Sequence, residues 1–130
     1  MKKLKMTFHG KDFYARLLTE EAPKTVAAIE AAGVFESRVG YAKLANREFF
    51  FQTPVFIDEE ENPTYSQKGH VIFYGPRQSI CVFYDDLIPL GYSNQFAVIE
   101  DEEQLKSLLK EADTIWEKQG DIIRIEVVEE

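Results

Sequence analysis

Arg77 is the first residue to consider for ligand binding, because it follows a Gly-Pro pair between two runs of β-forming residues. The runs His70–Tyr74 and Ser79–Tyr84 are rich in Val, Ile, Phe and Tyr, which favour β-strands. A Gly-Pro pair between two such runs indicates a turn. This pattern predicts a central hairpin with Arg77 and Gln78 at its tip. A guanidinium there either stays exposed or captures a ligand carboxylate with two parallel hydrogen bonds.

Other reactive side chains are few. Cys81 lies inside an apolar run, where a buried, inert thiol is expected, because a nucleophilic thiol needs a base or a helix end beside it. His9 and His70 are too far apart for a metal-spacing motif, although His70 beside a glycine could face a pocket. Asp85 and Asp86 have two readings, a general base or cation ligand and a pair of exposed or capping acids.

We expect a cleft on the side of the fold that binds a small carboxylate- or amide-bearing ligand or a short peptide. The residues chosen for it are Tyr41, Gln52, Tyr74, Arg77 and Asn94 as polar contacts and Phe49 or Phe51 as an apolar floor. No nucleophile–base pair, paired-carboxylate spacing or phosphate loop is visible, so no cofactor or metal is expected and catalysis is left open. The alternative is a non-catalytic interaction module, because aromatic residues make up 13% of the chain.

Charge narrows the range of partners. The formal net charge is −8, which repels nucleic-acid phosphates and anionic lipid, so neither is an expected partner. The single cysteine excludes an internal disulfide framework, and the basic start Met1-Lys2-Lys3 is not followed by the apolar stretch of a secretory signal. We therefore expect a cytoplasmic protein. Homo-oligomerisation through exposed aromatics stays open.

The elements that would position these residues follow from periodicity. Strands are expected at 4–8, Phe13–Leu18, Glu36–Lys43, Glu48–Ile57, His70–Tyr74, Ser79–Tyr84, Gln95–Ile99 and Ile122–Val128. Turns are expected at Gly10-Lys11 and around Asn46, and long loops at Asp58–Gly69 and Asp85–Asn94, the first with a solvated Glu59-Glu60-Glu61 run.

Two helices interrupt the strands. Pro23 in a first-turn position opens one that Gly33 ends, and residues 102–118 form the other, with Asp101 and Gln104 as a capping box and Trp116 on its apolar stripe. Strands joined mostly as hairpins predict a mainly β fold, a closed eight-stranded antiparallel barrel capped by two α-helices, in a single domain over residues 1–130.

The element order and several strings resemble the cyclophilins. The most specific is Ala22-Pro23-Lys24-Thr25-Val26 at the start of the first helix, and the passage Phe96–Leu109 fits loosely. The chain is more similar to a group of small prokaryotic cyclophilin-like proteins without a settled activity, through Phe35-Glu36-Ser37, Thr53-Pro54, the Gly69–Tyr84 hairpin and Asn94-Gln95-Phe96-Ala97. The resemblance implies the cyclophilin-like barrel.

The same resemblance argues against efficient prolyl isomerisation. Isomerase cyclophilins carry an arginine on the third strand, and Arg38, Lys43 and Arg47 are alternatives for it here. No Phe-Met pair precedes Gln52, and Trp116 is expected on a helix and not in a groove loop. Weak peptidyl-prolyl isomerase activity is therefore kept only as a further alternative.

Overall fold

The computed structural model describes residues 1–41, 46–87, 91–114 and 120–130, with the side chain of Asn46 left out. These residues form nine strands and two α-helices. The strands are β1 (Lys2–Phe8), β2 (Lys11–Leu17), β3 (Phe35–Tyr41), β4 (Asn46–Gln52), β5 (Pro63–Tyr65), β6 (His70–Tyr74), β7 (Ser79–Leu87), β8 (Tyr92–Val98) and β9 (Ile122–Glu129). The helices are α1 (Pro23–Ala31) and α2 (Glu102–Ala112).

Eight of the described strands close into an antiparallel barrel. Their order around the ring is β2-β1-β9-β3-β4-β7-β6-β8, and β8 pairs again with β2. The ninth strand, β5, pairs only with the first half of β8 and stands outside the ring. The predicted mainly β barrel with two helices is therefore confirmed, and all of its pairings are antiparallel.

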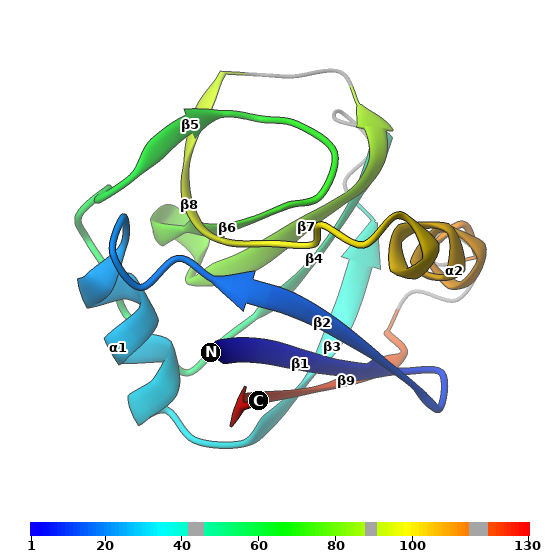
Figure 1. The fold of residues 1–130 in the computed structure, drawn as a ribbon, viewed down its shortest axis with the longest axis horizontal. Coiled ribbons are helices and arrows are strands. Elements are labelled where there is room, and N and C mark those ends of the chain that lie inside the picture. Colours follow the sequence, from blue (N-terminus) through cyan, green and yellow to red (C-terminus); the bar gives the residue numbers. More distant parts are fainter. Residues whose placement is uncertain (42–45, 88–90, 115–119) are drawn as a thin grey trace.

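Both helices contribute to the core that fills the barrel. They lie on opposite sides of the molecule, and the two termini lie side by side on β1 and β9 (Figure 1). Val26 and Ile29 of α1 and Leu105 and Leu108 of α2 join the buried cluster of barrel side chains. Each helix thus covers apolar side chains that would otherwise face water at an end of the ring.

The start of each helix was partly predicted. Pro23 occupies the first turn of α1, and the side chain of Asp101 accepts from the backbone N–H of Glu103 at 2.9 Å, as expected. Gln104 does not complete a capping box, because its Oε1 accepts from Tyr14 N–H of β2 at 2.7 Å. The described helix ends at Ala112, and Trp116 lies outside the described residues.

The acidic run at residues 59–61 was expected to be wholly solvated, and this expectation is wrong for Glu61. Its two carboxylate oxygens accept from the N–H groups of Lys24 and Thr25, at 3.0 and 2.9 Å, and so satisfy the start of α1. Burial alone would raise the pKa of Glu61, but these hydrogen bonds outweigh it and hold the pKa below its ordinary value.

Several boundaries also differ from expectation. The predicted loop 58–69 contains β5, β4 ends at Gln52, and β7 continues through Asp85 and Asp86 to Leu87. The first turn is His9-Gly10, with φ of 54° and 75°, which is the two-residue geometry that suits a twisted hairpin. The turn expected around Asn46 lies largely outside the described residues.

No helix in the described part of the chain is long and apolar enough to span a membrane.

Candidate functional site

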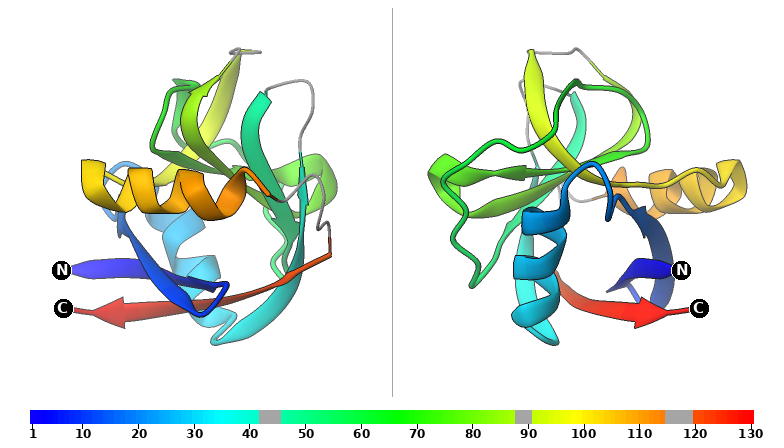
Figure 2. Two further views of the ribbon diagram at one scale, coloured as in Figure 1. Left: turned by 90° about the vertical axis from the view of Figure 1, so that its right-hand side faces the viewer. Right: turned by 60° about the vertical axis from the view of Figure 1, so that its left-hand side comes forward.

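An open cleft of about 460 Å³ lies on the outer face of the barrel. Its floor is the outer surface of β4, β7 and β6, and its far wall is formed by Ser66, which directly follows β5, and by the start of β8. The paired segments β5 and the start of β8 are here called the extension. Figure 2 shows the extension projecting from the rest of the barrel. We call this space the outer cleft. Such a volume suits a small organic molecule or a short peptide.

The register of three strands fixes the apolar floor of the outer cleft. Phe50 pairs with Cys81, and Cys81 pairs with Ile72, so the three side chains form one row across β4, β7 and β6. Their neighbours Phe49, Val82 and Val71 form the next row and point into the barrel, because successive side chains face opposite sides of a sheet. The outer row packs with Phe83 and Leu87 into a second, smaller apolar cluster.

Arg77 lies at one end of the outer cleft, on the turn that joins β6 to β7. Gly75–Arg77 form a single 3-10 turn that Gln78 closes with φ 48°. Gly75 is required here, because a Cβ atom would lie 2.8 Å from the carbonyl oxygen of Ile57. The turn therefore packs closely against the backbone at Ile57, which is what we mean by an anchored turn. The Arg77 side chain is exposed and forms no ion pair with any described carboxylate.

Glu48 lies at the other end of the outer cleft. Its carboxyl group is hydrogen-bonded to the Cys81 thiol, and no described cationic side chain pairs with it. Burial raises the pKa of Glu48, and the thiol only partly offsets this effect. The adjacent Arg47 is already engaged, because its Nη1 lies 3.0 Å from Asp113 Oδ1 and 3.5 Å from Asp85 Oδ2.

Cys81 is buried, as expected from its apolar run, with 7% of its surface exposed. Burial raises the pKa of its thiol well above the ordinary value, and the neighbouring Glu48 adds to the effect. A thiol that resists ionisation is a poor nucleophile. Cys81 therefore contributes surface and a hydrogen bond to the cleft floor.

The structure brings only two of the seven expected site residues, Tyr74 and Arg77, to the outer cleft. Phe49 and Phe51 have no exposed surface and fill the barrel interior, so they cannot form the floor of an open cleft. Phe50, between them, takes that place. The expectation was wrong by one residue because a one-position shift turns every side chain of a strand to the other face.

The other three expected residues lie elsewhere. Asn94 is 2% exposed and structural, since its Oδ1 accepts from Asn62 N–H at 3.0 Å and its Nδ2 donates to Thr25 Oγ1 at 3.2 Å. Gln52 is exposed in a neighbouring depression that Arg77 also lines. Tyr41 is half-buried and packs against the barrel core.

The other residues considered for binding or catalysis lie outside the outer cleft or are engaged in contacts within the fold. Asp85 is a counter-ion of Arg47. His70 is half-buried and lies outside the outer cleft; burial lowers its pKa, and its Nδ1 has no hydrogen-bond partner among the residues that the structure describes. Of the alternatives for an isomerase arginine, Arg38 donates to the carbonyl oxygen of Gly120 at 2.8 Å, Arg47 is ion-paired, and Lys43 lies outside the described residues.

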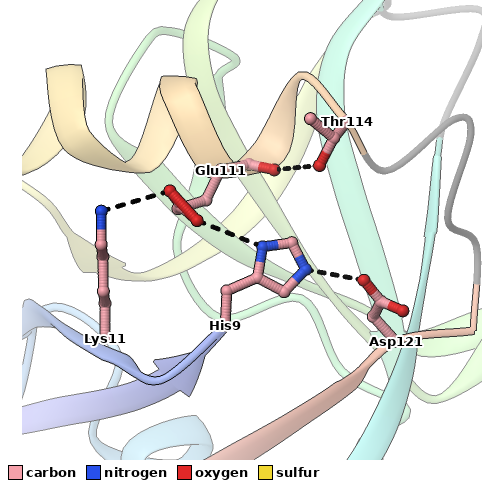
Figure 3. Close-up of polar contacts among 5 residues, drawn as sticks. All are labelled: His9, Lys11, Glu111, Thr114 and Asp121. Carbon is pink, nitrogen blue, oxygen red and sulfur yellow. Dashed lines mark hydrogen bonds and ion pairs between the residues drawn. The ribbon is translucent and has the colours of Figure 1, made fainter.

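A second group of charged side chains, the His9 cluster, joins the β1–β2 turn to α2 and the start of β9 (Figure 3). His9 Nε2 lies 2.6 Å from Asp121 Oδ2, and His9 Nδ1 lies 3.3 Å from Glu111 Oε1. Lys11 Nζ lies 3.3 Å from the other oxygen of Glu111. Both imidazole nitrogens and the Lys11 ammonium therefore face carboxylate oxygens within one cluster.

The fold and the outer cleft define a small antiparallel β-barrel protein with a ligand-sized cleft on its flank. No protein-family model matches the chain, and no curated protein matches it with significance. Among solved structures, the chain is similar to McbB in complex with tryptophan, with a TM-score of 0.81 and 14% identity over 97% of this chain. The chain spans 44% of McbB.

A second solved structure is similar over nearly the whole of both chains. The hypothetical protein AF2241 from Archaeoglobus fulgidus has a TM-score of 0.69 and 26% identity, with 95% of this chain and 92% of AF2241 covered. The two similarities support the barrel fold.

Proposed function

We propose that the protein binds a small organic carboxylate in the outer cleft, with the carboxylate on Arg77 and an apolar body on the Phe50–Cys81–Ile72 floor. The observation that carries this proposal is an anchored turn that presents a guanidinium, without a described carboxylate partner, at the end of an apolar surface. A planar guanidinium binds a carboxylate with two parallel hydrogen bonds. Tyr74 and Tyr92 add aromatic surface at the rim.

The structural similarity to McbB is consistent with this class of ligand, because McbB has been solved with tryptophan, an aromatic carboxylate. The two chains share only 14% identity, so the support is limited to the kind of molecule that such a barrel accommodates. We also infer that the chain is a cyclophilin-like barrel, as its eight-stranded ring and two helices fit that resemblance.

Calorimetric titration with 3-phenylpropionate and with its amide tests the proposal. We expect the carboxylate to bind about tenfold more tightly than the amide, since a charge-assisted pair contributes about 1.5 kcal/mol or more. Arg77→Gln is expected to abolish that preference. Arg124→Gln is the matched control, because Arg124 is an exposed arginine on β9, away from the cleft. Equal binding of both compounds, or a preference that survives Arg77→Gln, would contradict the proposal.

Efficient prolyl isomerisation is not part of the proposed function. No Phe-Met pair precedes Gln52 on β4, and the described arginines of β3 and β4 are engaged in other contacts. A coupled assay with proline-containing peptides is expected to show no turnover above the uncatalysed rate.

Self-association is a second candidate function, favoured by exposed aromatic side chains. Phe56 is 69% exposed and Tyr92 is 70% exposed, and the Tyr92 ring packs against Tyr65 at 5.5 Å. Light scattering across a concentration series tests it. Dimers that dissociate in Phe56→Ser would support self-association, and a monomer at all concentrations would contradict it.

A further inference from the structure

The outer cleft has a polar group at each end, and the two groups complement different ligand charges. Arg77 is a cation without a described anionic partner, and Glu48 is a carboxyl group without a described cationic partner. Elsewhere on the barrel, carboxylates such as Glu100 and Glu111 lie within ion-pair distance of a basic side chain. The two unpartnered groups line the same cleft, so one bound molecule can reach both.

The spacing between the two groups limits the length of that molecule. Glu48 and Gln52 are four residues apart on β4, which corresponds to about 13 Å along a strand. Gln52 pairs with Ser79, which is two residues from Arg77, so Arg77 lies near the Gln52 end. Both side chains line the outer cleft between these ends, so the separation of their charged groups is on the order of 10 Å.

A free amino acid is too short for this span, because its ammonium and carboxylate groups flank one residue of about 3.5 Å. An extended tripeptide covers roughly 10 Å. The floor between the two ends is apolar, formed by Phe50, Ile72 and Cys81. It is therefore complementary to an apolar central side chain.

We propose that the outer cleft binds short peptides with free termini, the C-terminal carboxylate on Arg77, the N-terminal ammonium on Glu48 and an apolar side chain between them. This inference rests on the proposed carboxylate site and names the ligand class. The ammonium supplies a cation that no described side chain gives to Glu48, and burial of the pair strengthens their attraction.

Titration calorimetry with the tripeptide Ala-Phe-Ala tests this pairing, with the N-acetylated and the C-amidated peptides and free phenylalanine as comparisons. For the wild-type protein we expect the free-ended tripeptide to bind about tenfold more tightly than each of the others. Glu48→Gln is expected to abolish the preference for a free ammonium and to retain that for a free carboxylate. Arg77→Gln is expected to have the converse effect. Circular dichroism verifies that both variants are folded.

The possible results separate this inference from the proposed function. If acetylation has no effect on the wild type, or if Glu48→Gln still prefers the free ammonium, the peptide assignment is wrong while an Arg77-dependent preference for carboxylates stands. If neither the peptides nor 3-phenylpropionate bind, both proposals fail. Binding of free phenylalanine as tightly as the tripeptide would overturn the inferred length.

Discussion

The His9 cluster and the outer cleft both contain partly buried charged groups. They differ in whether a described side chain of opposite character lies beside each group. In the His9 cluster, Glu111 faces His9 and Lys11, and Asp121 faces His9. Burial alone would raise the pKa of Glu111, but the two basic neighbours outweigh it and lower the pKa. In the outer cleft, burial raises the pKa of Glu48, because no described cation opposes it.

Under the proposed function, this difference separates charges that stabilise the fold from charges that are available to a ligand. Satisfied groups, such as those of the His9 cluster, tie β1, α2 and β9 together and have little left to offer a ligand. Unsatisfied groups cost folding free energy and gain from a ligand that completes them. We therefore expect substitutions to reduce stability in the His9 cluster and to affect binding in the cleft.

The largest effect is expected from His9→Asn. Asparagine tolerates the positive φ of this turn, so the substitution mainly removes the imidazole that bridges Glu111 and Asp121. We expect the free energy of unfolding at pH 6 to fall by about 2 kcal/mol, because hydrogen bonds to charged groups are lost. Urea denaturation measures this change. Lys11→Ala, at a half-exposed side chain, is the control and should cost about 0.5 kcal/mol or less. Equal losses of stability in the two variants would contradict a role for His9 in joining the β1–β2 turn to α2 and β9.

Glu48→Gln should have an intermediate effect of the opposite sign. A carboxyl whose pKa is raised in the folded state favours folding below its unfolded-state pKa of about 4.3, and this contribution is lost as the pH rises through the raised value. We therefore expect Glu48→Gln to be more stable than the wild type by about 1 kcal/mol at pH 8, with the gain shrinking toward pH 4. Urea denaturation at several pH values measures the difference. A less stable variant at pH 8 would show that Glu48 has an unrecognised cationic partner.

The smallest effect on stability is expected from Gly40→Ala. The Phe50 ring lies over Gly40, and an added Cβ would be 2.7 Å from Phe50 Cζ. The ring must move toward the cleft, so we expect 3-phenylpropionate to bind several-fold more weakly while stability changes by about 0.5 kcal/mol or less. Replacing the ring in Gly40→Ala/Phe50→Leu should restore much of the affinity. Unchanged affinity in Gly40→Ala would indicate that the floor does not contact the ligand.

Much of the fold could be predicted from the sequence, because alternation in β1 and helical spacing in α2 mark single buried faces. The strand β5 could not, since three residues beginning with a proline carry too little pattern. Its pairing with β8 depends on tertiary packing that local sequence does not encode.

The site was harder to predict than the fold, because Phe49-Phe50-Phe51 do not reveal which face is buried. The flanking residues contained the missing information. Glu48 and Gln52 share a face with Phe50, and two polar residues mark that face as the outer one. The position of Arg77 at the tip of the hairpin could be predicted because its turn is local. The absence of a described cation at Glu48 could not be predicted. The adjacent Arg47 is paired with Asp85 and Asp113, and these two acids come from segments far from Arg47 in the chain.

One measurement tests most directly that ligand binds on the outer face of the barrel. Ile72 lies on the cleft floor and Ile80, on the adjacent strand, points into the barrel with no exposed surface. In an NMR titration with 3-phenylpropionate, we expect the Ile72 δ-methyl resonance to shift in a saturable manner and that of Ile80 to stay in place. A shift of Ile80 without Ile72, or no saturable shift of either, would contradict a binding site in the outer cleft.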